Sequence, residues 1–161
     1  MKSGRRTLMK MLLIFSLLML DACSNDEPAL SGDQKDFNPF ILFENKAMRY
    51  FAGNHPGLAI LKYAQADLDN DGKDDLIVIY RVGNGKNQMC VILNREPDFV
   101  ETNSVPAPVS DQMIQFRNID KKPPLEFILQ GRKGAKVGYA IFRMEEEKLT
   151  DLFGEGMQDC C

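Results

Sequence analysis

Residues 66–75 read Ala-Asp-Leu-Asp-Asn-Asp-Gly-Lys-Asp-Asp and run directly into the apolar residues 76–80, Leu-Ile-Val-Ile-Tyr. Carboxylates recur at every second position in Asp67, Asp69 and Asp71, and a fourth follows at Asp75. So many like charges repel one another at close range unless a cation lies among them. Oxygen ligands in a flexible loop suit calcium, and suit magnesium less well. We therefore predict a calcium site in this loop, followed by a β-strand.

Glycine at position 72 allows the sharp turn that brings the loop back on itself, so the Lys73 carbonyl and the Asp75 carboxylate are expected to complete the site. The loop is not an EF-hand, because its twelfth position is Val78 instead of a bidentate Glu. The pattern Asp-x-Asp-x-Asp-Gly-x-x-Asp before a strand resembles the calcium loops of FG-GAP and VCBS-type β repeats. The alternative is a solvated turn between two strands that holds no metal.

The first 22 residues are predicted to be an export signal. A basic segment with lysine or arginine at positions 2, 5, 6 and 10 precedes the apolar residues 11–20, which are too few to span a bilayer. The following Leu20-Asp21-Ala22-Cys23 resembles the lipobox of bacterial lipoproteins, which implies cleavage before Cys23 and lipid on its thiol. The alternative is an ordinary cleaved signal with a free Cys23. Residues 23–36 are polar and are expected to form a disordered tether, so we predict an extracytoplasmic, membrane-anchored protein.

The bulk composition is that of one acidic domain. The chain has 161 residues and 44% hydrophobic residues, enough for a single core. Removal of residues 1–22 leaves 16 Lys and Arg against 22 Asp and Glu, a net charge near −6. A chain of this charge does not attract nucleic acid or anionic lipid electrostatically, and we expect no nucleic-acid partner.

The remaining pattern is mainly β. Pro39–Phe51 is predicted to be a helix, and the apolar residues 58–64, 76–82, 89–93, 113–116, 125–130 and 137–142 are predicted strands. The turn at 83–87 favours a hairpin. Residues 76–93 align with 125–142 at an offset of 49 without gaps, so we expect two repeats, near 58–103 and 113–153. The predicted fold is a compact antiparallel β domain over 37–153, built of two blade-like repeats with one N-terminal helix.

Three cysteines follow Cys23. Cys90 lies among apolar residues of a predicted strand, where a thiol is usually a small buried hydrophobe. Cys160 and Cys161 are adjacent at the end of residues 154–161, which Gly154 and Gly156 are expected to make flexible. Two exposed thiols outside the cytoplasm are easily oxidised, so we expect them to have a function. Three functions are considered: a disulfide to another chain, redox catalysis, or binding of a soft metal.

Local charge favours the metal. The neighbours Glu155 and Asp159 and the terminal carboxylate disfavour a thiolate and are expected to raise the thiol pKa. A redox cysteine is normally activated by the opposite environment. A thiophilic cation reverses the disadvantage, because its charge displaces the thiol protons. Paired thiolates suit Hg(II), Cu(I) and similar ions, and the C-terminal cysteine pair of bacterial mercuric reductase looks similar.

With its lipobox-like Cys23, its acidic loop and its Cys160-Cys161 pair, the chain resembles the Cys-Cys-COOH (seleno)protein SaoC family of the selenocysteine-assisted organometal system. The resemblance implies work beside an ABC-type transporter, a thioredoxin-like protein and an organomercurial-lyase-like protein. We therefore predict a metal-binding and transfer protein, and not an enzyme, whose dithiol captures a mercury-like metal or organometal species. Two alternatives stay open: a thiol–disulfide exchange protein that uses the same pair, and a calcium-loop β binding module.

Overall fold

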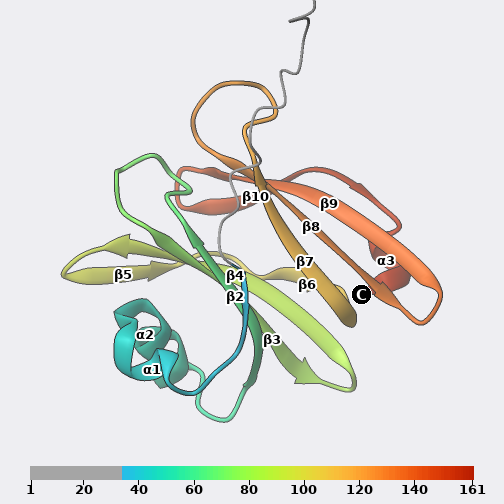
Figure 1. The fold of residues 1–161 in the computed structure, drawn as a ribbon, viewed down its shortest axis with the longest axis horizontal. Helices are drawn as coiled ribbons and strands as arrows, with labels where there is room; N and C mark the ends of the chain where they lie inside the picture. Colours follow the sequence, from blue (N-terminus) through green and yellow to red (C-terminus); the bar gives the residue numbers. More distant parts are fainter. Residues whose placement is uncertain (1–33) are drawn as a thin grey trace, which may run out of the picture.

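A computed structural model describes residues 34–161 (Figure 1). The predicted export signal, Cys23 and most of the tether lie outside the described residues. Within 34–161 the chain is mainly β, as predicted, and no helix there is long and apolar enough to cross a membrane. The elements are, in chain order, β1 (Lys35–Asp36), α1 (Ile41–Glu44), α2 (Lys46–Asn54), β2 (Ala59–Ala66), β3 (Asp75–Gly83), β4 (Lys86–Arg95), β5 (Asp98–Glu101), β6 (Val105–Ala107), β7 (Ser110–Arg117), β8 (Glu126–Lys133), β9 (Lys136–Glu145), β10 (Lys148–Glu155) and α3 (Met157–Cys160).

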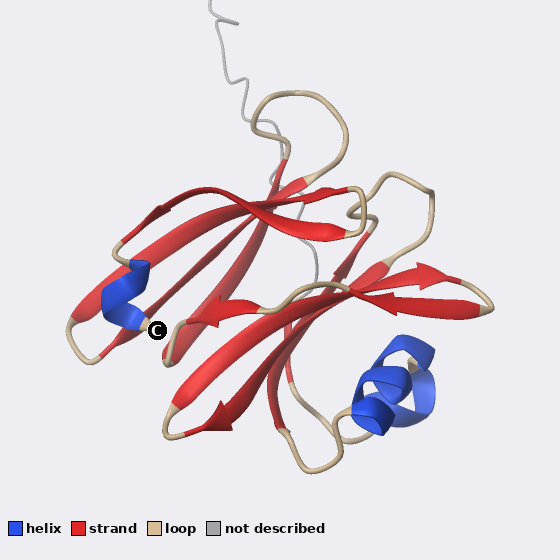
Figure 2. Ribbon diagram, turned by 180° about the vertical axis from the view of Figure 1, so that it is seen from behind, coloured by secondary structure: helices blue, strands red, loops and turns tan. Residues whose placement is uncertain are grey.

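The strands form two antiparallel sheets that pack against each other (Figure 2). The first sheet has the order β1-β2-β3-β4-β5, with β6 paired to β4, and the second has the order β10-β9-β8-β7. The predicted hairpin joins β3 to β4, with Gly83 opposite Lys86. Its two turn residues, Asn84 and Gly85, have φ of 49° and 72°. Positive φ at both positions is the geometry that two-residue hairpin turns require.

The central strands β3 and β4 are buried on both faces. Alternate side chains such as Ile77 and Ile79 enter the core between the sheets, where they meet Phe127 of β8. The intervening side chains, such as Val78, pack under α2 against Phe51. Burying one such side chain contributes about 1.5–3 kcal/mol to folding. This double burial explains why these two strands read as unbroken apolar runs instead of an apolar–polar alternation.

The single predicted helix over Pro39–Phe51 is wrong, because the structure has two helices there. Asn45 has extended backbone angles (φ −113°, ψ 115°) and separates α1 from α2. Its side-chain oxygen accepts the N–H of Met48 at 2.8 Å and so caps α2. In a continuous helix this N–H would bond to a backbone carbonyl. Because the asparagine side chain accepts it instead, the break between the helices costs little free energy.

The two-repeat interpretation is not confirmed. The strand pairs β2–β3 and β7–β8 both enclose a long loop, and both are continued by two further antiparallel strands. Within residues 34–161, however, the sheets have six and four strands, and the helices α1 and α2 cover only the first (Figure 1). The repeat therefore stays a prediction, whereas the antiparallel two-sheet architecture is observed.

Candidate functional site

The acidic loop, residues 67–74 between β2 and β3, brings three of its predicted ligands together. One carboxylate oxygen from each of Asp67, Asp69 and Asp71 lies within 4.8 Å of the others. Asp67 accepts the N–H groups of Asp71 (3.1 Å) and Gly72 (2.9 Å), and Gly72 has the positive φ (84°) that its turn requires. Among the described residues this is the cluster of acidic groups close enough to hold one ion.

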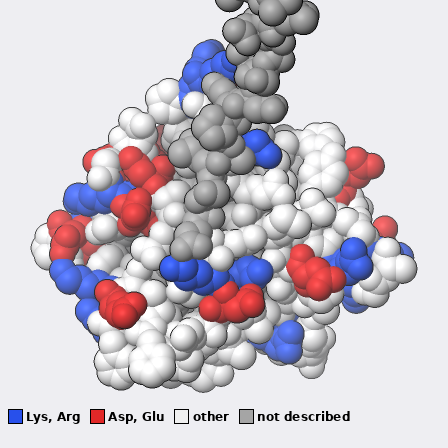
Figure 3. All heavy atoms as spheres, viewed as in Figure 1, with Lys and Arg blue, Asp and Glu red and all other residues white. Residues whose placement is uncertain are grey.

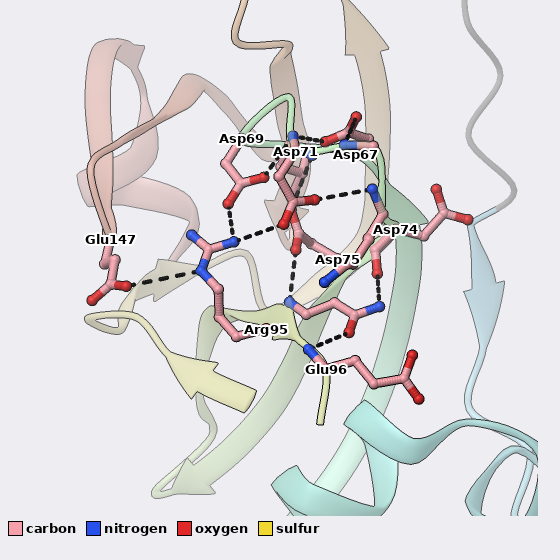
Figure 4. Close-up of polar contacts among 12 residues, drawn as sticks. Asp67, Asp69, Asp71, Asp74, Asp75, Arg95, Glu96 and Glu147 are labelled. Atoms are coloured by element: carbon pink, nitrogen blue, oxygen red, sulfur yellow. Dashed lines mark hydrogen bonds and ion pairs between the residues drawn. The ribbon is translucent and has the colours of Figure 1, made fainter. Parts of the chain in front are cut away.

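Arg95, at the end of β4, already faces this cluster (Figure 4). Its Nη1 lies 2.5 Å from Asp69 Oδ2 and 3.1 Å from Asp71 Oδ2. The hydrogen bond to Asp69, with added attraction from the other carboxylates, raises the pKa of the Arg95 guanidinium. One guanidinium against three carboxylates leaves a formal charge of −2, which a divalent ion would neutralise. The donor set therefore fits calcium, although Arg95 relieves part of the repulsion on which the metal prediction rests.

Asp75, the fourth predicted ligand, lies outside the three-carboxylate cluster. It is fully buried at the start of β3, where its Oδ2 accepts the N–H of Leu68 (3.0 Å) and its Oδ1 that of Asn94 (2.9 Å). The Asp75 carboxylate therefore joins Leu68, near the start of the loop, to Asn94 on β4. The Lys73 N–H donates to Asp71 at 2.9 Å, and the ligand role of the Lys73 carbonyl stays a prediction.

Burial raises the pKa of the Asp75 carboxyl from its ordinary 3.8 to about 6; its two backbone hydrogen bonds oppose the shift, and the charges of Asp69 and Asp71 add to it. Because the folded state holds this proton more tightly than the unfolded chain, the group stabilises the fold below about pH 4 and loses that contribution as the pH rises through about 6. In the presence of a chelator, we expect the unfolding free energy of the parent to fall relative to Asp75→Asn over this window, by on the order of 2 kcal/mol. Denaturant unfolding at several pH values measures the difference, and parallel curves for the two proteins would contradict the assignment.

A cleft of about 830 Å³ separates the acidic loop from residues 118–125, the corresponding loop of the second sheet. The second loop is closed in a similar way, since the buried Glu126 accepts the N–H of Ile119 at 2.9 Å. Arg143 pairs there with Asp120 (3.0 Å) and with Glu126 (3.3 Å). Arginine therefore balances acidic groups in both loops. Acidic and basic side chains also alternate over the face seen in Figure 3.

Residues 154–161 were expected to be flexible with both thiols exposed, and the exposure is wrong for Cys160. β10 continues to Glu155, and α3 then packs against the inner strands β9 and β8 of the second sheet and also contacts β6 of the first (Figure 1). Cys160 is 0% exposed, and its carbonyl accepts the N–H of Val109 at 2.9 Å. Cys161 is half-buried. The two cysteines therefore belong to a packed element of the domain.

Two glycines make this packing possible. A Cβ atom on Gly138 of β9 would lie 2.5 Å from the Gly156 carbonyl and 2.8 Å from the sulfur of Cys160. Gly156 has φ +68°, and a Cβ on it would lie 2.6 Å from the Val137 carbonyl oxygen. Such contacts are closer than side chains tolerate, so only glycine allows α3 to approach β9 this closely.

The structure gathers three sulfur atoms, which we call the sulfur cluster: those of Met157, Cys160 and Cys161. The Sγ atoms of the two cysteines are 3.5 Å apart, and Met157 Sδ lies 3.7 Å from Cys160 Sγ. All three described cysteines are free thiols. Sequence reasoning missed Met157, although its spacing of three from Cys160 places both on one helical face.

The Cys161 thiol is held in its neutral form. Burial, followed by the hydrogen bond and charge of Cys160, raises the pKa of Cys161 to about 12, and Lys133 opposes the shift. The direction agrees with the expectation for this residue, but the cause differs. Asp159, expected to act on the pair, instead forms an ion pair with Lys136 at 2.9 Å. A thiol in this state is a weak nucleophile until a cation displaces its proton.

Cys90 is a buried core residue, as expected. It is 0% exposed on β4, under α2, and burial raises the pKa of its thiol strongly, with Glu101 adding to the effect. Glu101 is also bonded to the Nε2 atom of His55, at 2.8 Å. Cys90 therefore lies in a different part of the core from the sulfur cluster, which packs against the second sheet.

A cavity of about 490 Å³ adjoins the sulfur cluster. Met157 and Cys161 contribute to its walls together with Val105 and Phe142. The cavity gives a small molecule or ion a route to Cys161 that the buried Cys160 does not have.

Comparison of the chain with protein-family models, curated proteins and solved structures found no significant match. The function is therefore argued from the chemistry of the two sites.

Proposed function

We propose that the Cys160–Cys161 pair captures a thiophilic metal or organometal ion, of the Hg(II) kind, and passes it to a partner. The observation that carries the proposal is the pair of free Sγ atoms 3.5 Å apart, one of which borders a cavity. Soft thiolates select soft cations. The raised pKa of Cys161 favours a metal, which can displace its proton, over exchange with a disulfide, which needs a thiolate in advance.

Release to a partner follows from the same geometry. With metal–sulfur bonds of about 2.3 Å, a linear two-coordinate ion needs its sulfur atoms about 4.6 Å apart. The pair is about 1 Å too close for this geometry as it stands. A linear ion is therefore bound under strain, which favours exchange with another thiol. The partners implied by the family resemblance, an ABC-type transporter, a thioredoxin-like protein and an organomercurial-lyase-like protein, belong to this proposal.

Titration of the reduced chain with Hg(II), with free thiols counted and mapped by mass spectrometry, tests the capture. We expect Cys160 and Cys161 to become unreactive together at one ion per chain while Cys90 keeps its free thiol. Turnover of a disulfide substrate without stoichiometric binding would support the exchange alternative instead.

The acidic loop is proposed to hold one calcium ion that stabilises the fold. Extracellular calcium modules bind with dissociation constants of about 10⁻⁴–10⁻³ M, so 10 mM calcium should stabilise the fold by about 1.4–2.7 kcal/mol. We expect thermal unfolding to show this as a rise in melting temperature of several degrees that Asp69→Asn abolishes. Arg95→Gln should enlarge the rise, because it removes the competing cation. If Arg95→Gln destabilises the protein and calcium does not restore it, the loop is a turn balanced by arginine alone.

Lipid attachment at Cys23 is proposed from the sequence pattern alone, since this residue lies outside the described part of the chain. It would hold the domain on the outer side of a membrane. The parent should partition into the detergent phase of a phase-separating detergent, and Cys23→Ser should move to the aqueous phase. Equal partitioning of both proteins would contradict lipidation.

A further inference from the structure

The sulfur cluster has a third member that the proposed dithiol site does not use. Met157 lies one helical turn before Cys160, and its Sδ is 3.7 Å from Cys160 Sγ. Part of the Met157 side chain packs against the core between the sheets, a role that leucine would fill equally well. The rest borders the cavity beside Cys161. The thioether therefore lies where an ion bound to both cysteines would be within reach.

The sulfur separations do not fit a two-coordinate ion. With metal–sulfur bonds of about 2.3 Å, sulfur atoms lie about 3.8 Å apart around a tetrahedral ion, about 4.0 Å around a trigonal one and about 4.6 Å around a linear one. The observed separations of 3.5 and 3.7 Å suit an ion with three or more ligands, and three sulfur atoms are gathered here. A third sulfur at this spacing is of little use to an ion that prefers two ligands.

We propose that Met157, Cys160 and Cys161 form a three-sulfur site for a monovalent soft cation, of which Cu(I) is the type. The inference rests on the proposed function and adds to it a third ligand and a preference among soft ions. Thiolate and thioether ligands together are a donor set that selects Cu(I) over harder divalent ions. Two thiolates, a neutral thioether and one monovalent ion leave a single negative charge, and Lys133 provides a nearby positive charge.

Burial of the site suits this ion. Cys160 is fully buried, while Met157 and Cys161 are half-buried and border the cavity. A Cu(I) ion held here is partly shielded from water and oxygen, and the cavity leaves it accessible to a thiol of an acceptor. Entry and exit therefore use the Cys161 side of the cluster.

The test is an anaerobic Cu(I) titration of the reduced full chain in detergent, in competition with a Cu(I) chelator. We expect Met157→Leu to lower Cu(I) affinity by about tenfold or more and to leave the Hg(II) affinity within about threefold. X-ray absorption at the copper edge should count three sulfur ligands in the parent and two in Met157→Leu. Met144→Leu, at a core methionine of β9, is the matched control and should behave as the parent.

Unchanged Cu(I) affinity in Met157→Leu, or two sulfur ligands in the parent, would overturn the three-sulfur site and leave the dithiol proposal intact. A parent that binds neither Hg(II) nor Cu(I) would overturn the proposed function together with this inference. Circular dichroism of each variant shows whether it is folded, so a loss of affinity is attributed to the site only where the spectrum matches that of the parent.

Discussion

Replacement of both Cys160 and Cys161 by serine is expected to lower the affinity for Hg(II) by about 10⁴-fold. Structural zinc sites gain about 10–16 kcal/mol from four ligands, or about 3 kcal/mol for each, and each 1.4 kcal/mol is a factor of ten. Competition with a small dithiol chelator measures the loss. Cys90→Ala is the matched control, because it removes a described cysteine that lies away from the sulfur cluster, and its affinity should equal that of the parent.

The two single variants should differ. Cys161→Ser changes a half-buried group beside the cavity and should leave stability nearly unchanged. Cys160→Ser places a hydroxyl at a fully buried position, and we expect it to cost about 1–2 kcal/mol of unfolding free energy. This differs from the sequence-based expectation of an exposed thiol at Cys160, whose replacement would cost little stability. Hg(II) affinity that survives in the double serine variant would contradict the dithiol site.

Features decided by nearby residues could be predicted from the sequence. The hairpin between β3 and β4 follows from Asn84 and Gly85 between two apolar runs. The approach of Asp67, Asp69 and Asp71 follows from their alternation in one short loop. Each depends on fewer than about ten residues of chain, the range over which local backbone preferences determine structure.

Features that depend on residues far apart in the sequence could not be predicted from it. Arg95 enters the acidic loop from 24 positions beyond Asp71, and nothing in its own surroundings marks it as the partner. Asp75 continues the acidic pattern of the loop, yet its carboxylate is buried and accepts the backbone N–H of Asn94 on β4. In both cases the pairing of strands distant in the sequence determines the role of the side chain. Sequence periodicity does not specify that pairing, so it does not distinguish a metal ligand from a structural group.

The position of the cysteine pair depends on the same kind of contact. Two glycines and three polar residues among positions 154–161 predict a flexible segment, because no local sequence pattern identifies a surface on which they could pack. The sequence feature that could have predicted this packing is Gly138, a glycine inside a strand. Such a glycine commonly marks the close approach of another segment of backbone.

Substitution of Gly138 by alanine is therefore expected to displace α3 and expose Cys160. The added methyl carbon would lie 2.5 Å from Gly156 and 2.8 Å from Cys160 Sγ. Overpacking of this kind costs about 1–3 kcal/mol, which corresponds to an increase of about 5–150-fold in the population with α3 undocked. We expect the modification rate of Cys160 by a thiol reagent to rise by that factor and Cu(I) affinity to fall, because separation of α3 from β9 opens the sulfur cluster to water.

Gly53→Ala is the matched control for this substitution. Gly53 lies in α2, and a Cβ there meets no atom within 4 Å, so alanine should be neutral or slightly stabilising through its helix propensity. The modification rate of Cys160 in Gly53→Ala should equal that of the parent. If Gly138→Ala leaves Cys160 as protected as in the parent, α3 is not held by this contact. If Cys160 already reacts as fast as a free thiol in the parent, the pair acts from an extended chain, and the three-sulfur geometry does not describe the form that binds metal.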